Sequence, residues 1–228
     1  MNKTAIITGA SSGIGLGVAR KLINEDYNVV LAARSKEKIE MHANELNELN
    51  KGKALAIQTD VMDQKAVEEM VKHTIDVFGT VDVYVNNAGQ MLSASVTDGQ
   101  VEEWERMIDV NIKGVLYGIN AVLPHMKDRE TGHIINISSV SGQEVTKMST
   151  VYSATKFAVR AISIGLEKEL ARTGVRVTNI SPGMVDTDLI SVSTDRKPLD
   201  VSDIAEAIIY ALKQPSYVNV NEITVRPV

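Results

Sequence analysis

Seven short apolar runs alternate with longer amphipathic runs along the 228 residues of this chain, and this alternation restricts the possible folds more than any other feature. The short runs are TAIITG, NVVLAA, KALAIQTD, VDVYVNN, GHIINISS, VRVTNIS and NEITVRP. Most are almost continuously apolar, which is typical of parallel strands covered on both faces. A strand with one face in water would instead alternate apolar and polar residues.

The longer runs have the spacing of amphipathic helices, and they separate each strand from the next. They fall at about residues 13–26, 36–50, 63–78, 100–128, 151–172 and 201–213. Each is long enough for the crossover that joins two parallel strands. The pattern therefore predicts an α/β fold over residues 1–228 as one domain, a doubly wound parallel sheet of seven strands with helices on both faces.

One long stretch, residues 183–200, carries neither pattern and is rich in Ser, Thr and Asp. Irregular segments of this length in a compact domain usually serve as lids or binding loops. We therefore expect this segment to form a substrate loop.

Charge and cysteine content exclude several classes of function. The formal net charge of −5 disfavours a broad nucleic-acid surface, so we expect no nucleic-acid partner. The absence of cysteine rules out disulfides, redox thiols and cysteine-ligated metals. The four histidines have no ligand spacing, so we expect structural roles for them and no metal site: His42, His73, His125 and His133.

Hydropathy along the chain gives no sign of a membrane segment. No apolar run approaches the ~20 residues of a membrane span. The N-terminal residues MNKTAIITGA contain no apolar core of the kind found in signal peptides. We expect a cytoplasmic protein without a membrane partner.

A glycine-rich turn, TGASSGIG, joins the first strand to the first helix. Gly9, Gly13 and Gly15 permit a tight turn and a close approach of the backbone to a pyrophosphate, which the N–H groups of the helix N-terminus would bind. The spacing GxxxGxG differs from the common GxGxxG fingerprint, so the turn also fits a βα connection that binds no ligand.

The residue after the second strand bears on which dinucleotide would bind. NAD sites usually place an acidic residue there to bond the ribose 2′-hydroxyl, but this chain has Ala33 followed by Arg34. A guanidinium suits a 2′-phosphate by charge and by its forked donors, and Ser35 and Lys36 could assist. The sequence favours NADP over NAD, with a solvated Arg34 as the alternative.

Polar residues follow the strands at the edge of the sheet where ligands of open α/β folds bind. They are Asp60, the segment Asn86-Asn87-Ala88-Gly89, Ser138-Ser139 and Pro182-Gly183. Each also has an ordinary interpretation as a helix cap or a turn. Their coincidence on one edge predicts a binding site there.

The stretch VYSATKFA places Tyr152 and Lys156 one helical turn apart. A free phenol has a pKa near ~10, too high for a base at neutral pH. A cation within ~4–6 Å favours the phenolate, so Lys156 is expected to lower the pKa of Tyr152. An ordinary surface pair would have the same spacing.

Taken in order, these residues resemble the short-chain dehydrogenase/reductase family over essentially the whole chain. The matching elements are TGASSGIG, Asp60, NNAG, Asn111, Ser139, YSATK and SPGMVDT, and Ser139 precedes Tyr152 by 13 residues, as is usual in that family. The resemblance implies an NAD(P)-dependent oxidoreductase on a single Rossmann domain, acting on a small carbonyl or alcohol, and a homodimer or homotetramer.

The resemblance also implies roles for individual residues. Tyr152 would be the general acid/base and Lys156 its partner, Ser139 would hold the substrate oxygen, and Asn111 would position a water molecule linking Lys156 to solvent. The residues implied to bind the cofactor are Gly9, Ser11, Ser12, Gly13, Ile14, Gly15, Arg34, Asp60, Val61, Asn87, Ala88, Gly89, Tyr152, Lys156, Pro182, Gly183, Val185 and Thr187.

The substrate is the least defined part of this interpretation. The expected wall consists of the loop from Met184 to about Pro198, the residues Ser141, Gly142, Gln143 and Met148, and Met91. Arg196 and Lys197 are candidates for binding a carboxylate. The tail ALKQPSYVNVNEITVRPV resembles members of the family that act on 3-hydroxy acids such as serine or 3-hydroxypropionate.

Two alternatives remain at this stage. A 3-oxoacyl-carrier-protein reductase would share the catalytic residues and would need a basic docking surface, for which Arg129, Arg160 and Arg172 are candidates. A non-catalytic NADP-binding sensor or scaffold would generally lack one of the residues Ser139, Tyr152 and Lys156, all of which are present.

Overall fold

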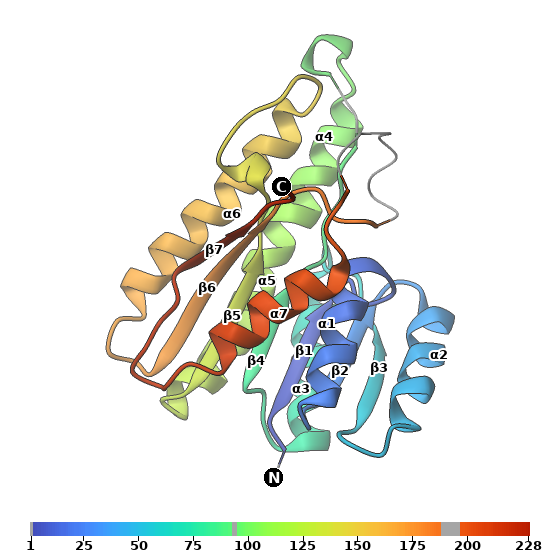
Figure 1. Ribbon diagram of the computed structural model, residues 1–228, viewed down its shortest axis with the longest axis vertical. Helices are drawn as coiled ribbons and strands as arrows, with labels where there is room; N and C mark the ends of the chain where they lie inside the picture. Colours follow the sequence, from blue (N-terminus) through green and yellow to red (C-terminus); the bar gives the residue numbers. More distant parts are fainter. Residues whose placement is uncertain (1, 93–94, 188–196) are drawn as a thin grey trace.

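The computed structural model describes residues 2–92, 95–187 and 197–228. Seven parallel strands form one sheet in the order β3-β2-β1-β4-β5-β6-β7 (Figure 1). The strands are β1 (Thr4–Thr8), β2 (Asn28–Ala33), β3 (Ala54–Gln58), β4 (Val83–Asn86), β5 (Gly132–Ile137), β6 (Val175–Pro182) and β7 (Glu222–Val225). The prediction of a seven-stranded parallel sheet is confirmed.

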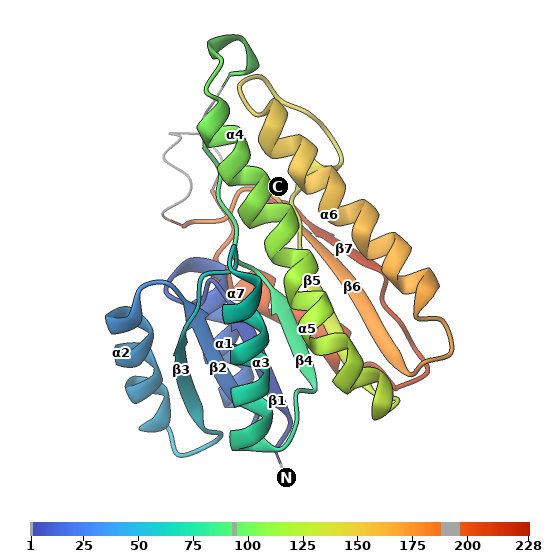
Figure 2. The same cartoon turned by 180° about the vertical axis from the view of Figure 1, so that it is seen from behind.

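Helices cover both faces of the sheet, as predicted (Figures 1 and 2). They are α1 (Gly13–Asn24), α2 (Lys36–Asn47), α3 (Gln64–Phe78), α4 (Val101–Ile108), α5 (Gly114–Asp128), α6 (Thr150–Glu169) and α7 (Val201–Leu212). One buried cluster includes residues of α1, α2 and α7, and a second includes residues of α3, α5 and α6. No helix within the described ranges is long and apolar enough to cross a bilayer.

The two clusters explain why the strands are almost continuously apolar. In β1, Ala5 and Ile7 belong to the cluster on the α1 side, whereas Ile6 belongs to the cluster on the α5 side. Successive strand residues point to opposite faces, so a sheet buried on both sides needs an apolar residue at almost every position.

The helix expected over residues 100–128 is interrupted. A π-helical turn, η2 (Asp109–Lys113), separates α4 from α5 and contains Asn111. Such turns occur mostly as single insertions in α-helices, frequently at functional sites. Two short 3₁₀ turns, η1 (Val96–Asp98) and η3 (Val140–Gly142), were not predicted, because three residues are too few for a periodic pattern.

The strand order reverses direction at β1, which pairs with β2 on one side and with β4 on the other. The connections after β1 and after β4 therefore lead to opposite sides of the sheet. This divergence opens a crevice beyond the carboxyl ends of the two strands, where open α/β sheets bind their ligands.

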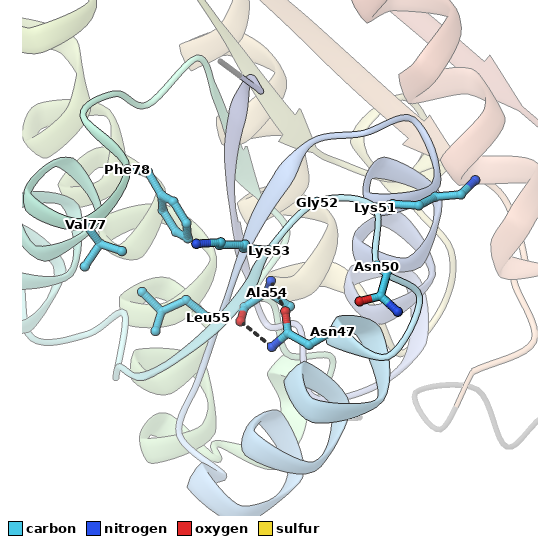
Figure 3. Close-up of a pocket in the computed structure, with 9 residues that line it drawn as sticks. All are labelled: Asn47, Asn50, Lys51, Gly52, Lys53, Ala54, Leu55, Val77 and Phe78. Atoms are coloured by element: carbon cyan, nitrogen blue, oxygen red, sulfur yellow. Dashed lines mark hydrogen bonds between the residues drawn. The ribbon is translucent and has the colours of Figure 1, made fainter.

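At the opposite, amino-terminal end of β3 lies a hollow of about 510 Å³, drawn in Figure 3. Its lining includes Asn47, Asn50 and Ala54. The Asn47 side chain accepts a hydrogen bond from the Ala54 N–H (2.8 Å) and donates one to the Ala54 carbonyl (3.0 Å). The amide thus takes the place of a neighbouring strand at the edge of the sheet.

We predict that Asn47→Ala lowers the free energy of unfolding by about 1–3 kcal/mol, because it leaves both backbone groups of Ala54 without their partner. Urea denaturation measures the change. Asn44→Ala is the matched control, because Asn44 lies in the same helix, is exposed, and its side chain makes no hydrogen bond within the described residues. Equal stabilities of the two variants would contradict the role of Asn47.

Candidate active site

The glycine-rich turn after β1 packs directly against the segment after β4. Gly9 has a φ of +66°, and a Cβ built on it would lie 2.8 Å from the Cα of Ala88. A Cβ on Gly15 would lie 2.5 Å from the Asn87 amide nitrogen and 2.6 Å from the Gly9 carbonyl. These glycines are therefore required for the packing of the two segments, whether or not a ligand is bound.

Thr8 and Asn87 hold this contact together. The Asn87 side-chain amide donates to the Thr8 carbonyl (2.8 Å), and the Thr8 hydroxyl accepts from the N–H groups of Asn87 and Ala88 (both 3.0 Å). Asn87 was expected to line the cofactor path, and its amide also has this structural use. Sequence analysis missed Thr8, although it begins the TGASSGIG motif.

The N-terminus of α1 has polar groups available for an anion. Ser12 occupies the capping position in extended conformation, but its side chain makes no capping hydrogen bond. The first N–H groups of a helix have no partner within the helix. A Cβ on Gly13, whose φ is +54°, would lie 3.3 Å from the Thr187 methyl group, so Thr187 lies beside this turn. Ser11 and Ile14 complete the turn and are half-buried.

Arg34 is exposed just beyond the end of β2. Its backbone carbonyl accepts from the Gln58 side chain (3.0 Å). Within the ranges described, no carboxylate lies in ion-pair distance of its guanidinium. Ser35 occupies the capping position of α2, and its hydroxyl makes no capping bond. The guanidinium and the hydroxyl are both available to a phosphate group.

Asp60 is not the cap of the next helix. Asp63 has that role, since its carboxylate accepts from the N–H groups of Lys65 (2.9 Å) and Ala66 (3.3 Å). One oxygen of Asp60 accepts from the Met62 N–H (3.0 Å), which shapes the turn after β3. The neighbouring Val61 packs against the start of α5, where a Cβ on Gly114 would lie 3.0 Å from a Val61 methyl group. The ordinary interpretation of Asp60 as a helix cap is wrong.

Lys156 lies buried in α6, with 5% of its surface exposed. Its Nζ donates to the Ile137 carbonyl at the end of β5 (2.9 Å) and lies 5.8 Å from the centroid of the Tyr152 ring. A Cβ on Gly89 would be 3.5 Å from the same Nζ, which places the end of NNAG beside the ammonium. Burial lowers the pKa of Lys156 to about 8.

The pKa of Tyr152 departs from the expectation. Burial raises the pKa of Tyr152 above that of a free phenol, and a hydrogen bond with the Ser139 hydroxyl offsets part of this rise. The expected lowering by Lys156 is not found in this structure. Sequence spacing gave the separation of the two groups but not their burial, which disfavours the charged form of each.

Asn111 connects the π-helical turn to α6. Its side-chain oxygen accepts from the Gln90 N–H (2.8 Å), and its amide nitrogen donates to the Gln90 carbonyl (2.9 Å) and the Thr155 hydroxyl (3.0 Å). The Thr155 hydroxyl in turn donates to the Tyr152 carbonyl (2.7 Å). Sequence analysis missed Gln90 and Thr155, because such contacts join residues far apart in the chain.

The segment after β6 reaches the glycine-rich turn, since Thr187 lies beside Gly13. Pro182 ends β6, the Gly183 N–H donates to the Val225 carbonyl (2.7 Å), and the buried Val185 pairs with Leu199. This pairing joins the two ends of the segment expected to be a substrate loop. Residues 188–196 of that segment, including the candidate Arg196, lie outside the described residues, whereas Lys197 lies within them.

The expected substrate wall is only partly assembled at the site. Ser139 is the capping residue before η3, where its hydroxyl accepts from the Ser141 N–H (3.1 Å). A Cβ on Gly142 would lie 2.8 Å from the Lys156 carbonyl, so η3 packs tightly on α6. Met91 and Met148 are exposed, at 39% and 56%, and thus are not packed in the core.

Two of the three cations proposed for carrier-protein docking are already paired. Arg160 binds the Glu222 carboxylate through two nitrogens, and Arg129 binds Asp82 at 3.1 Å. Arg129 and Arg160 were candidates for the basic docking surface of the carrier-protein alternative, and these ion pairs within the chain leave them less available to an acidic partner. Arg172 is exposed.

Three of the four histidines bond to groups outside this site. His133 is buried in β5, its Nε2 lies 2.8 Å from the Thr178 hydroxyl, and burial lowers its pKa to about 3. His125 accepts from the Val81 N–H (3.3 Å), and His42 lies 3.3 Å from the Glu45 carboxylate. Among the residues that the structure describes, His, Asp and Glu form no group able to hold a metal ion.

Comparison with known proteins places this geometry in a family. The family model described as short chain dehydrogenase matches residues 3–198. An uncharacterised oxidoreductase of Staphylococcus aureus is 56% identical over 229 residues, covering 100% of this chain and 98% of that protein.

Solved structures with a similar fold point to the same family. A serine dehydrogenase complexed with NADP+ is 34% identical, with a TM-score of 0.91 and coverage of 97% of this chain and 94% of that one. An alcohol dehydrogenase from the archaeon Thermococcus sibiricus, complexed with 5-hydroxy-NADP, is 34% identical with a TM-score of 0.93, covering 100% and 97%. With the family model matching most of its length, this chain belongs to the short-chain dehydrogenase/reductase family of NAD(P)-dependent oxidoreductases.

Proposed function

We propose that this protein is an NADP-dependent oxidoreductase that interconverts a small secondary alcohol and its carbonyl compound, with Tyr152 as general acid/base. The observation that carries the proposal is the position of Lys156, whose buried ammonium lies between the Tyr152 ring and the NNAG segment. One side chain can thus serve both the proton donor and a dinucleotide bound along the carboxyl edge of the sheet.

The residues present fit a phosphate-bearing dinucleotide. The first turn of α1 offers backbone N–H groups, and the Ser12 hydroxyl beside them makes no capping hydrogen bond. Arg34 and Ser35 offer further donors just after β2. Helix N-termini and guanidinium groups both bind phosphate oxygens. A bound nicotinamide cofactor supplies the hydride in this chemistry.

The protein supplies the proton and stabilises the developing negative charge. In the direction of reduction, Tyr152 gives its proton to the substrate oxygen, and the Ser139 hydroxyl donates a hydrogen bond to the same oxygen. Burial keeps the pKa of Tyr152 above its ordinary value, so the phenol holds its proton at neutral pH. This favours Tyr152 as an acid in the reduction of a carbonyl.

NADP is the preferred cofactor in this proposal. The second strand ends with Ala33 and Arg34 where NAD sites usually have a carboxylate. The NADP+ complex of the serine dehydrogenase and the 5-hydroxy-NADP complex of the alcohol dehydrogenase support this choice. The same two relatives support a small hydroxy compound, such as a 3-hydroxy acid, as substrate.

The assembly and extent of the protein belong to the same proposal. We expect residues 1–228 to act as one cytoplasmic domain within a homodimer or homotetramer. Exposed apolar side chains on α4, α5 and α6 support an assembly, among them Ile108, Leu116, Phe157 and Ile164. Molecular mass in solution tests it.

Tyr152→Phe should lower the rate of carbonyl reduction by at least ~10²-fold, because it removes the proton donor. NADPH binding should change little, since the ring remains. Steady-state reduction of a panel of ketones and 3-oxo acids, with fluorescence titration of NADPH, measures both. Tyr217→Phe is the matched control, with a tyrosine that is 88% exposed. Near-normal turnover by Tyr152→Phe would remove this residue from the mechanism.

Arg34→Gln should raise the NADPH dissociation constant about 10- to 100-fold, because a hydrogen bond to a charged group contributes ~1.5–3 kcal/mol. The NADH dissociation constant should stay the same. Lys38→Gln removes an equal charge four residues further on, within α2, and serves as control. A wild-type protein that prefers NADH would show that Arg34 does not recognise a 2′-phosphate.

The NADPH dissociation constant should rise with pH above about pH 8. Lys156, whose pKa is about 8, loses its charge as the pH rises through this value. An anionic cofactor favours the charged form, so binding takes up a proton there and weakens by up to ~10-fold per pH unit. Fluorescence titration from about pH 7 to about pH 9.5 measures this. A constant affinity over that range would show that Lys156 does not change its charge on binding.

A further inference from the structure

Glu222, the first residue of β7, accepts hydrogen bonds from four side chains. Its Oε1 accepts from Gln143 (3.0 Å), Asn179 (3.3 Å) and Ser181 (3.4 Å). The Arg160 guanidinium donates to both oxygens, with Nε 3.0 Å from Oε1 and Nη2 3.0 Å from Oε2. The Glu222 side chain is 26% exposed and that of Arg160 is 36% exposed, so the pair is partly shielded from water.

The four donors come from three segments of the chain, and each segment is close to a residue of the proposed site. Gln143 directly follows η3, and Ser139 is the capping residue directly before it. Arg160 lies one helical turn after Lys156 in α6, and Ser181 lies in β6 just before Pro182. A single carboxylate therefore connects the segments that carry the substrate-oxygen donor, the acid/base pair and the expected nicotinamide contacts.

The contacts also fix the orientation of Gln143. Its amide nitrogen donates to Glu222 and to the Thr224 hydroxyl (2.8 Å). Its oxygen is left to accept from Arg226 (3.4 Å), whose guanidinium also pairs with Glu144 (2.9 Å). With the nitrogen held by Glu222, the two ends of the Gln143 amide cannot exchange without losing these bonds. Gln143, in the segment after Ser139, is thereby held against β7 by hydrogen bonds.

The charge balance is consistent with a fixed carboxylate. Burial alone raises the pKa of Glu222, but hydrogen bonds from Arg160, Gln143 and Ser181 and the charge of Arg160 outweigh it, so its pKa is lowered. Glu222 thus stays ionised through the neutral range. Removing the carboxylate would leave the Arg160 guanidinium without its partner and Gln143 without its orientation.

We propose that Glu222 is a positioning residue that aligns η3, and with it Ser139, relative to the Tyr152–Lys156 helix. It touches neither cofactor nor substrate and acts through Gln143, Arg160 and Ser181. This inference rests on the proposed function for its catalytic consequence, but the alignment itself is a property of the protein alone.

Asp82 provides a matched control. Its side chain is 17% exposed and pairs with Arg129 (3.1 Å), accepts from the Thr4 N–H (2.8 Å) and accepts from the Thr80 hydroxyl (3.3 Å). It immediately precedes β4 and lies at the amino-terminal end of the sheet, away from the proposed site. Asp82→Ala therefore removes a comparable set of bonds at the other end of the strands.

The experiment compares Glu222→Ala, Glu222→Gln and Asp82→Ala in two measurements. The first is hydrogen exchange of the Gly142 and Gln143 amides, which bond the carbonyls of Ser139 and Val140 at 2.9 Å. The second is steady-state carbonyl reduction with NADPH, together with the NADPH dissociation constant.

For Glu222→Ala we expect exchange at the two amides to speed up about 10-fold or more, and kcat/KM to fall about 10- to 100-fold, since small misplacements of catalytic groups have effects of this size. NADPH affinity should change little. Glu222→Gln keeps an acceptor and should show smaller changes in the same direction. Asp82→Ala should lower the free energy of unfolding but leave the exchange at the two amides and kcat/KM unchanged.

Equal exchange at η3 in Glu222→Ala and Asp82→Ala would overturn the proposal, as would an unchanged kcat/KM in an active protein. If Glu222→Ala does not fold, Glu222→Gln and Arg160→Gln provide the same comparison. A wild-type protein that reduces no carbonyl would refute the proposed function, and the exchange measurement would still decide whether Glu222 aligns η3.

Discussion

The contact between the glycine-rich turn and the NNAG segment is the constraint on which the rest of the site depends. Gly9 and Gly15 lie so close to Asn87 and Ala88 that a Cβ at either glycine would overlap them. The Thr8 hydroxyl and the Asn87 amide fasten the two segments by hydrogen bonds. Because β1 and β4 are neighbours at the reversal of strand order, this contact fixes the floor of the crevice.

From that floor a series of hydrogen bonds reaches the proposed acid/base. Gln90, next after NNAG, is held on both its backbone groups by the Asn111 side chain in the π-helical turn. Asn111 bonds Thr155, and Thr155 bonds the carbonyl of Tyr152. The position of Tyr152 is therefore tied to the segment after β4 as well as to its own helix. A second connection is the hydrogen bond between Glu222 in β7 and Gln143, in the segment after Ser139.

Burial favours the neutral form of both central groups, which lowers the pKa of Lys156 and raises the pKa of Tyr152. Lys156 is inside the protein with one carbonyl partner, so its charge is only moderately stable. Tyr152 is held in its neutral form by the same desolvation. A negatively charged ligand beside Lys156 would favour the ammonium and, through it, the phenolate.

The sequence by itself determined the sheet, the order of helices and strands, and the family, because hydrophobic periodicity and short motifs are local properties of the chain. It also indicated which strand ends carry polar residues. Only the tertiary structure decided which of those residues act on each other: that Asn111 bonds Thr155, that Arg160 is paired with Glu222, and that Tyr152 is buried. The two pairings join residues tens of positions apart in the chain, and the burial of Tyr152 removes it from water. Neither effect can be predicted from a local sequence pattern.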